Sequence, residues 1–163
     1  MIRYARIPTP AGTLFATAAE GAITGIYFEN QQYFPRMDDW QEDPSAAPLA
    51  ECARQIGEYF DGKRTEFDLP LAPEGTDFQQ RVWKQIAGIP FGKTITYAEL
   101  AKRAGAEGSA RAAGAATGRN PITLVVPCHR VVGSDGSLTG YAGGLPRKTK
   151  LLEIEGALQG SLV

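Results

Sequence analysis

The sequence predicts a two-domain protein, with an α/β domain in residues 1–75 and a mainly α domain in residues 76–163. Three observations support this reading. Residues 1–30 show strand-like alternation and precede an amphipathic helix, residues 47–60. Residues 69–75 hold two prolines and a glycine, which interrupt any periodicity and indicate a linker. Two short helices joined by a glycine-containing turn then outline a helix-turn-helix.

The N-terminal half begins with a predicted hairpin. Two strand-like runs, Thr13–Ala18 and Ile23–Phe28, flank the turn signal Glu20-Gly21. Residues 31–47 are mostly polar and predict a surface loop. Cys52 lies on the apolar stripe of the helix that follows, so we expect it in the core.

The C-terminal half contains three predicted helices before residue 120. Apolar residues at helical spacing mark the first, residues 78–86. Thr96 and Glu99 form a predicted capping box, in which each side chain satisfies the other's free amide, and they open the second helix. Ser109 is the expected cap of the third, Ala110–Ala116.

The most informative pair is Cys128 and His129, because His129 is the only histidine and directly follows the best nucleophile in the chain. The pair comes after an apolar run, Ile122–Val126, which predicts a strand. Neighbouring residues on a strand point to opposite faces, so the pair can act together only under one of two conditions. Either the chain turns at Pro127-Cys128, or a water bridges the imidazole and the sulfur. The alternative is that Cys128 is simply a small buried hydrophobic residue.

Composition is that of a soluble globular protein, with 43% hydrophobic and 21% charged residues and no run long enough to span a membrane. The first residues lack the apolar core of a signal peptide. Two distant cysteines, Cys52 and Cys128, do not suggest a disulfide framework, so a reducing intracellular compartment is expected. Two cysteines and one histidine are too few for a structural zinc site, and we expect no metal.

Charge is divided unevenly between the two halves. Residues 1–77 have 6 basic against 13 acidic residues, net −7, and residues 78–163 have 11 against 5, net +6. This asymmetry favours a phosphate-facing surface on the C-terminal half, although chance segregation or docking of one domain on the other would also produce it. The predicted final helix, residues 147–156, ends at the stop signal Gly156. Its basic residues, which either contact phosphates or are solvated, are Arg147, Lys148 and Lys150.

A series of landmarks occurs in one order over residues 76–163. They are Ile89-Pro90-Phe91-Gly92, Thr96-Tyr97, Arg111, Asn120-Pro121, Pro127-Cys128-His129-Arg130-Val131, Tyr141-Ala142-Gly143-Gly144 and Glu153-Ile154-Glu155-Gly156. This series resembles the O6-alkylguanine-DNA alkyltransferases, also called methylated-DNA–protein-cysteine methyltransferases. A weaker match at Thr9–Leu14 extends the resemblance to the N-terminal half. The resemblance implies a ribonuclease-H-like α/β domain followed by a helix-turn-helix, winged-helix-like domain.

The resemblance implies DNA repair by direct reversal. An alkyl group would pass irreversibly, in a single turnover, from O6 of guanine in duplex DNA to Cys128, after the nucleotide is flipped out of the helix. It implies that His129 deprotonates Cys128 through a water and that Glu155 orients the imidazole. It implies no cofactor, and double-stranded DNA carrying O6-alkylguanine as the partner. A monomer is expected inside the cell, in the cytoplasm if the source is bacterial; O4-alkylthymine repair and cooperative DNA binding stay open.

The resemblance also assigns DNA contacts. Tyr97 would donate a hydrogen bond to guanine N3, where negative charge develops, and crowd the nucleotide's phosphate. Arg111 would fill the space left by the flipped base, on a recognition helix in the minor groove. Asn120 would be the hinge that joins this helix to the active-site strand. The other expected DNA-contacting residues of the helix are Ser109, Ala110, Ala112 and Gly114. The alternatives are that Tyr97 is a core residue, that the small residues of the helix serve close helix packing, and that Asn120-Pro121 is an ordinary turn.

The alkyl and base pocket is expected to be lined by six residues: Pro127, Val131, Tyr141, Ala142, Gly143 and Gly144. Ala142 stands where some family members carry a serine that can bond guanine O6, so that contact is in question. Cys128 argues against the alkyltransferase-like subgroup, which has another residue at this position. Two other functions stay open: a non-catalytic lesion sensor or DNA-binding regulator, and a thiol hydrolase, for which no oxyanion motif is evident.

Overall fold

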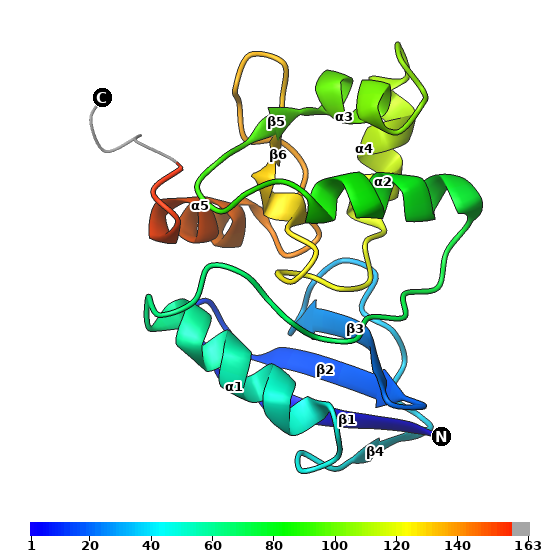
Figure 1. Cartoon of the computed structure of the whole chain (residues 1–163), viewed down its shortest axis with the longest axis vertical. Coiled ribbons are helices and arrows are strands. Elements are labelled where there is room, and N and C mark those ends of the chain that lie inside the picture. Colours follow the sequence, from blue (N-terminus) through cyan, green and yellow to red (C-terminus); the bar gives the residue numbers. More distant parts are fainter. Residues whose placement is uncertain (158–163) are drawn as a thin grey trace. The chain divides into compact units, whose positions relative to one another are not determined.

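The computed structural model describes residues 1–157 (Figure 1). They form two compact units. The first comprises Met1–Glu74 together with Pro121–Val125, and the second comprises Gly75–Asn120 and, of the described residues, 126–157. The expected division into residues 1–75 and 76–163 did not include the return of Pro121–Val125 to the first unit.

A four-stranded sheet in the order β3-β2-β1-β4 forms the centre of the first unit. Its strands are β1 (Ile2–Ile7), β2 (Leu14–Ala19), β3 (Ala22–Phe28) and β4 (Trp40–Glu42). The predicted hairpin is confirmed: β2 and β3 are antiparallel, and Glu20 and Gly21 between them both have positive φ, as a tight hairpin turn requires. The prediction that residues 31–47 are only a loop is wrong, because β4 pairs with β1 in parallel. Three residues are too few to show a period of two.

Helix α1 (Leu49–Phe60) packs against β1 and β2 of this sheet (Figure 1). Its buried residues recur at the predicted helical spacing and include Leu49, Cys52, Ile56 and Tyr59. Cys52 is fully buried, which confirms its place in the core.

The predicted apolar strand before the cysteine is not a regular strand. Ile26 of β3 donates its amide to Pro121 O at 2.8 Å and accepts from the Thr123 amide at 3.0 Å, which forms a single parallel bridge. Leu124 then adopts a left-handed conformation, with φ of 76°, and the extended course ends. The run is apolar because it is buried, and an apolar run alone cannot separate a strand from a buried irregular segment.

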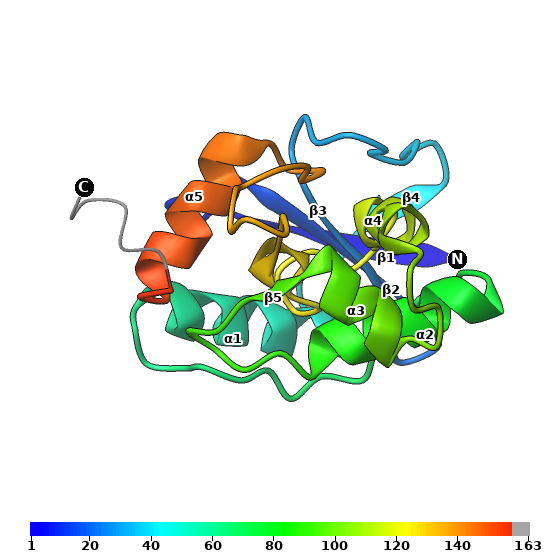
Figure 2. The same cartoon turned by 90° about the horizontal axis from the view of Figure 1, so that it is seen from above.

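In the second unit, α2 (Asp77–Ala87), α3 (Tyr97–Arg103) and α4 (Ala110–Gly118) pack on one another (Figures 1 and 2). The two helices of the predicted helix-turn-helix are therefore present. The buried Trp83 indole donates to Ala116 O at 2.8 Å and joins α2 to α4.

The helix starts differ from the predictions in detail. The Thr96 hydroxyl accepts from the Glu99 amide as predicted, but the Glu99 carboxylate pairs with Arg103 at 2.8 Å instead of returning to the cap. An i,i+4 ion pair competes with the second half of the box. Ser109 stands at the N-cap of α4, yet its side chain makes no capping bond. A full capping box occurs at α2 instead, between Thr76 and Gln79.

The remaining elements surround the cysteine. Cys128–Arg130 forms a 3₁₀ helix, followed by β6 (Val131–Val132), which pairs in parallel with β5 (Ile95–Thr96). The 3₁₀ helix contacts both α2 and α5 (Leu145–Ile154). Helix α5 ends as predicted, with Gly156 at a φ of 70°.

Candidate active site

The chain turns at Pro127-Cys128, which meets the first of the two conditions for a working cysteine–histidine pair. The Cys128 amide donates to Val126 O at 2.8 Å, and the Arg130 amide donates to Pro127 O at 2.9 Å. Cys128 is 4% exposed and His129 is fully buried. The two residues therefore lie on one tight helical turn, not on opposite faces of a strand.

His129 is held by a carboxylate that lies 26 residues later in the chain. Its Nε2 is 2.8 Å from Oε2 of Glu155, which is the C-cap residue of α5. Burial by itself would raise the pKa of Glu155, but hydrogen bonds from His129 and Arg130 outweigh it and lower the pKa to about 2. Glu155 is therefore an anion over the whole physiological pH range.

The imidazole is neutral near pH 7. Burial lowers the pKa of His129, an effect that the hydrogen bond and negative charge of Glu155 oppose. Its other nitrogen, Nδ1, is buried and has no hydrogen-bond partner among residues 1–157. Nδ1 is therefore the nitrogen available to take up a proton.

Cys128 is buried among polar groups. Burial raises the pKa of its thiol, whereas a hydrogen bond with the Asn120 side chain and the positive charge of Lys148 act to lower it. The Asn120 amide also donates to Val126 O at 2.8 Å, so one side chain joins the end of α4 to the turn before the cysteine. The thiol is protonated at rest, and it needs a base to become a nucleophile.

Lys148 lies close enough to Cys128 for its charge to act on the thiol, which differs from the expected phosphate-contacting or solvated position. It is fully buried, neither solvated nor facing phosphates, and its Nζ donates to Val131 O at 2.6 Å, Thr139 O at 3.0 Å and Gly140 O at 3.2 Å. Burial lowers its pKa to about 8, although Cys128 acts to raise it. The available signal was spacing, because the buried positions of α5 and its C-cap recur as on one helical face: Lys148, Leu151, Leu152 and Glu155.

Tyr97, the first residue of α3, lies between α4 and the segment Thr139-Gly140. Its hydroxyl donates to Thr139 O at 3.0 Å, with Gly140 O at 3.4 Å. A Cβ on Gly114 would lie 3.7 Å from the Tyr97 ring, so α4 approaches that ring closely. Burial raises the pKa of Tyr97 to about 12, which keeps the hydroxyl protonated and able to donate.

The structure places the other predicted residues in two groups. On α4 and at its cap, Ser109, Arg111 and Ala112 are exposed, whereas Ala110 and Gly114 are half-buried. The expected pocket residues divide similarly. Pro127 and Val131 are buried, and the partly exposed ones are Tyr141, Ala142, Gly143 and Gly144.

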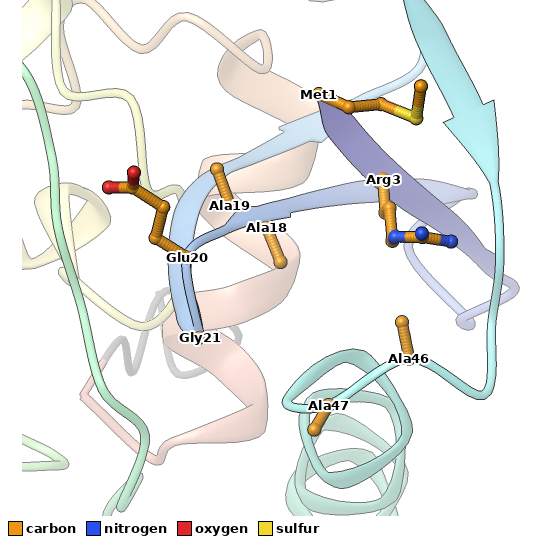
Figure 3. Close-up of a pocket in the computed structure, with 8 residues that line it drawn as sticks. All are labelled: Met1, Arg3, Ala18, Ala19, Glu20, Gly21, Ala46 and Ala47. Atoms are coloured by element: carbon orange, nitrogen blue, oxygen red, sulfur yellow. The ribbon is translucent and has the colours of Figure 1, made fainter.

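A small pocket in the first unit offers no comparable chemistry. Its volume is about 160 Å³. In Figure 3 the side chains of Arg3 and Glu20 extend in opposite directions, and Arg3 pairs with Asp43 at 2.6 Å. The lining residues, which include no cysteine, serine, histidine or lysine, are Met1, Arg3, Ala18, Ala19, Glu20, Gly21, Ala46 and Ala47.

Within residues 1–157, no three histidine, cysteine, aspartate or glutamate side chains gather in a way that could hold a metal ion. Over the same residues, no helix combines the length and apolar character needed to cross a membrane.

Both halves of the chain match models of one family. Residues 2–73 match the ribonuclease-like domain of 6-O-methylguanine DNA methyltransferase, and residues 77–157 match its DNA binding domain.

Similar proteins and structures agree with these matches. The methylated-DNA–protein-cysteine methyltransferase of Mycobacterium tuberculosis is 47% identical over 155 residues, which is 95% of this chain and 93% of that protein. The protein of the same name from Methanosarcina barkeri is 45% identical, over 93% and 96% of the two chains. The crystal structure of M. tuberculosis OGT in complex with DNA has a TM-score of 0.88 at 46% identity, with coverage of 95% and 93%.

Proposed function

Because the chain belongs to the 6-O-methylguanine DNA methyltransferase family, we propose that it repairs DNA by moving an alkyl group from O6 of guanine to Cys128. The observation that carries this proposal is the arrangement of Cys128, His129 and Glu155 at the site. Cys128 and His129 share one helical turn, Glu155 holds Nε2 of the imidazole at 2.8 Å, and Nδ1 is left without a partner among the described residues. A nucleophile, a base and a group that orients the base are therefore present together.

The transfer is a displacement at the alkyl carbon. The thiol proton passes to Nδ1 of His129, through one water, and the sulfur electron pair forms a bond to the carbon. The bond between that carbon and O6 breaks, and its electron pair stays with guanine, which then takes up one proton. No step restores the thiol, so each molecule acts once, and the reaction needs no cofactor.

DNA is the proposed partner, bound through α4. The exposed face of this helix consists of small side chains and Arg111, which suits close approach to the narrow minor groove. The alkyl carbon is unreachable within the duplex, so the nucleotide must rotate out, and Arg111 would fill its place. The division at residues 75 and 76 would then separate the DNA-binding half from its companion domain.

Binding of the base requires a rearrangement at Tyr97. Its hydroxyl is engaged by Thr139 O, and Cys128 is only 4% exposed. For Tyr97 to donate to guanine N3, it must exchange one acceptor for the other. We expect the same movement to open the loop Gly140–Gly144 and admit the base to the pocket bordered by Pro127 and Val131.

A lesion sensor without chemistry is the second candidate, and the presence of Cys128 on the same helical turn as His129 disfavours it. We expect the protein to act as a monomer inside the cell, in the cytoplasm if the source is bacterial, where genomic DNA is present and thiols stay reduced. The experiment that tests the transfer also measures the size of the alkyl group that the pocket admits, and a further duplex that carries O4-methylthymine tests repair of that lesion.

The test is intact mass spectrometry after mixing with duplexes that carry O6-methyl-, O6-ethyl- or O6-benzylguanine. We expect one alkyl adduct per protein, on the peptide that contains Cys128, and restored guanine in the DNA. Binding without any gain in mass would reject alkyl transfer and favour the sensor. Turnover beyond one equivalent would reject the irreversible mechanism.

A further inference from the structure

Arg130 follows the Cys128-His129 pair, and its side chain is almost completely buried. Its guanidinium donates to both oxygens of Glu155: Nε to Oε1 at 2.8 Å and Nη2 to Oε2 at 2.9 Å. Nη1 donates to Ile89 O at 2.6 Å, and the guanidinium carbon lies 5.8 Å from the centre of the Phe91 ring. A buried arginine that makes such a planar bidentate contact holds a carboxylate in one orientation.

One oxygen of Glu155 is shared. Oε2 lies 2.8 Å from Nε2 of His129 and 2.9 Å from Nη2 of Arg130. A carboxylate anion can only accept hydrogen bonds, and an arginine can only donate them. With Glu155 held as an anion, the hydrogen between Glu155 and His129 must reside on Nε2. A neutral imidazole has one hydrogen, so Nδ1 is left with its lone pair.

We propose that Arg130 is a positioning residue that sets the tautomer of His129, keeping Nδ1 free to accept the proton of Cys128. Without the guanidinium, the buried carboxylate has two ways to lose its unpaired charge. A protonated Glu155 would donate to Nε2 and move the imidazole hydrogen to Nδ1. Alternatively, His129 would take up a proton from solvent and pair with the carboxylate as an imidazolium, with hydrogen on both nitrogens. Either outcome blocks Nδ1 as a base.

The other groups around the imidazole act in the same direction. The positive charges of Arg130 and Lys148 both disfavour the imidazolium, and only Glu155 favours it. The Tyr141 ring lies edge-on, with its centre 6.5 Å from that of His129. The adjacent Cys128 is a neutral thiol at rest. Arg130 therefore keeps His129 both neutral and in the Nε2–H form.

The test uses the fact that the chain has one histidine. A two-bond ¹H–¹⁵N correlation spectrum of the full chain, prepared without a histidine tag, reports both nitrogens of His129 without assignment ambiguity. For the wild type between pH 7 and 8 we expect a neutral ring with hydrogen on Nε2. A wild-type spectrum with hydrogen on Nδ1 would overturn the proposal, and this measurement needs no variant and no DNA.

Variants then test the part played by Arg130. In Arg130→Met we expect hydrogen to appear on Nδ1, with the rate constant for transfer from free O6-benzylguanine at least tenfold lower and its KM changed less than twofold. Arg130→Lys keeps a cation beside Glu155 and is expected to retain the wild-type tautomer. Arg54→Met, which removes an exposed arginine of α1, is the matched control. An unchanged tautomer in Arg130→Met, or an Arg130→Lys spectrum like that of Arg130→Met, would reject the assignment.

The kinetic part rests on the proposed function, and the spectroscopic part does not. If the wild-type protein failed to transfer an alkyl group, the proposed function would fall while the tautomer could still be measured. If transfer occurred and the tautomer of His129 did not depend on Arg130, only the role assigned to Arg130 would be rejected.

Discussion

The chain has two cysteines, both buried and neither in a disulfide, in different surroundings. Cys52 lies on α1 against the apolar core of the first unit, and burial alone raises the pKa of its thiol to about 12. Burial also raises the pKa of the Cys128 thiol, but the Asn120 side chain and the charge of Lys148 act against it. Burial thus does not distinguish a structural thiol from a nucleophile. The polar groups around the sulfur do.

The largest expected effect comes from removing each sulfur in turn. Cys128→Ala should abolish transfer to the protein, because no other group receives the alkyl carbon. Cys52→Ala should transfer at the wild-type rate and lose about 1–2 kcal/mol of unfolding free energy, since it leaves a small cavity in the core. Intact mass and urea denaturation measure the two effects. An adduct on Cys52 in the Cys128→Ala protein would contradict the conclusion that only Cys128 acts as a nucleophile.

Acid should change the stability of the protein differently through the carboxylate near Cys128, Glu155, and through a carboxylate of α1, Glu51. Glu155 and Glu51 both have pKa values lowered to about 2, but Glu155 is buried and Glu51 is half-buried beside Arg54, with 43% of its side chain exposed. A lowered folded-state pKa stabilises the fold above the unfolded value, and this stabilisation is lost as the pH falls from about 4.5 to 2. For Glu155 the loss amounts to about 3 kcal/mol when complete.

The measurement is the change in unfolding free energy between pH 7 and pH 3. Glu155→Gln should reduce this pH dependence, although it also destabilises the protein at pH 7 by leaving Arg130 without its partner. Glu51→Gln, the control at a half-buried carboxylate that solvent reaches, should retain most of it. Equal pH dependence in both variants would show that Glu155 is not the acid-sensitive group.

Of the two thiols, only Cys128 must be reached by a substrate. Arg111 is proposed to help a flipped nucleotide reach it. Arg111→Ala should slow repair of methylated duplex by roughly 10- to 100-fold, because extrusion of the nucleotide costs a few kcal/mol that Arg111 would help to offset. Transfer from free O6-benzylguanine should change less than twofold, since no extrusion is needed. Single-turnover rates on both substrates provide the measurement. Equal losses on the two would contradict the role given to Arg111.

The smallest expected effect concerns the charge near Cys128. Lys148→Met removes a cation that lowers the thiol pKa, so the rate of benzylguanine transfer should fall about tenfold at pH 7 and its rise with pH should move to higher pH. Lys150→Met, an exposed lysine of the same helix, is the control and should behave as wild type. Iodoacetamide labelling of Cys128 in a Cys52→Ala background reports the same pKa. An unchanged pH profile in Lys148→Met would show that Lys148 does not influence the pKa of the Cys128 thiol.

Local patterns in the sequence were enough to predict the hairpin, α1, the helices of the helix-turn-helix and the stop of α5 at Gly156. Each of these depends on residues within one or two turns of each other, so periodicity, caps and glycines carry the information. The Cys128-His129 pair was equally visible, because the two residues are adjacent.

Tertiary structure alone decided what surrounds that pair. Lys148 is charged and belongs to a basic cluster, yet it is buried because three carbonyls from elsewhere in the chain receive its hydrogen bonds. Arg130 and His129 meet on one carboxylate, Glu155, which only a family resemblance could suggest as a partner for the histidine. The apolar run before the cysteine bends at Leu124 after a single bridge. Burial of a charge depends on partners far away in sequence, and no local pattern specifies them.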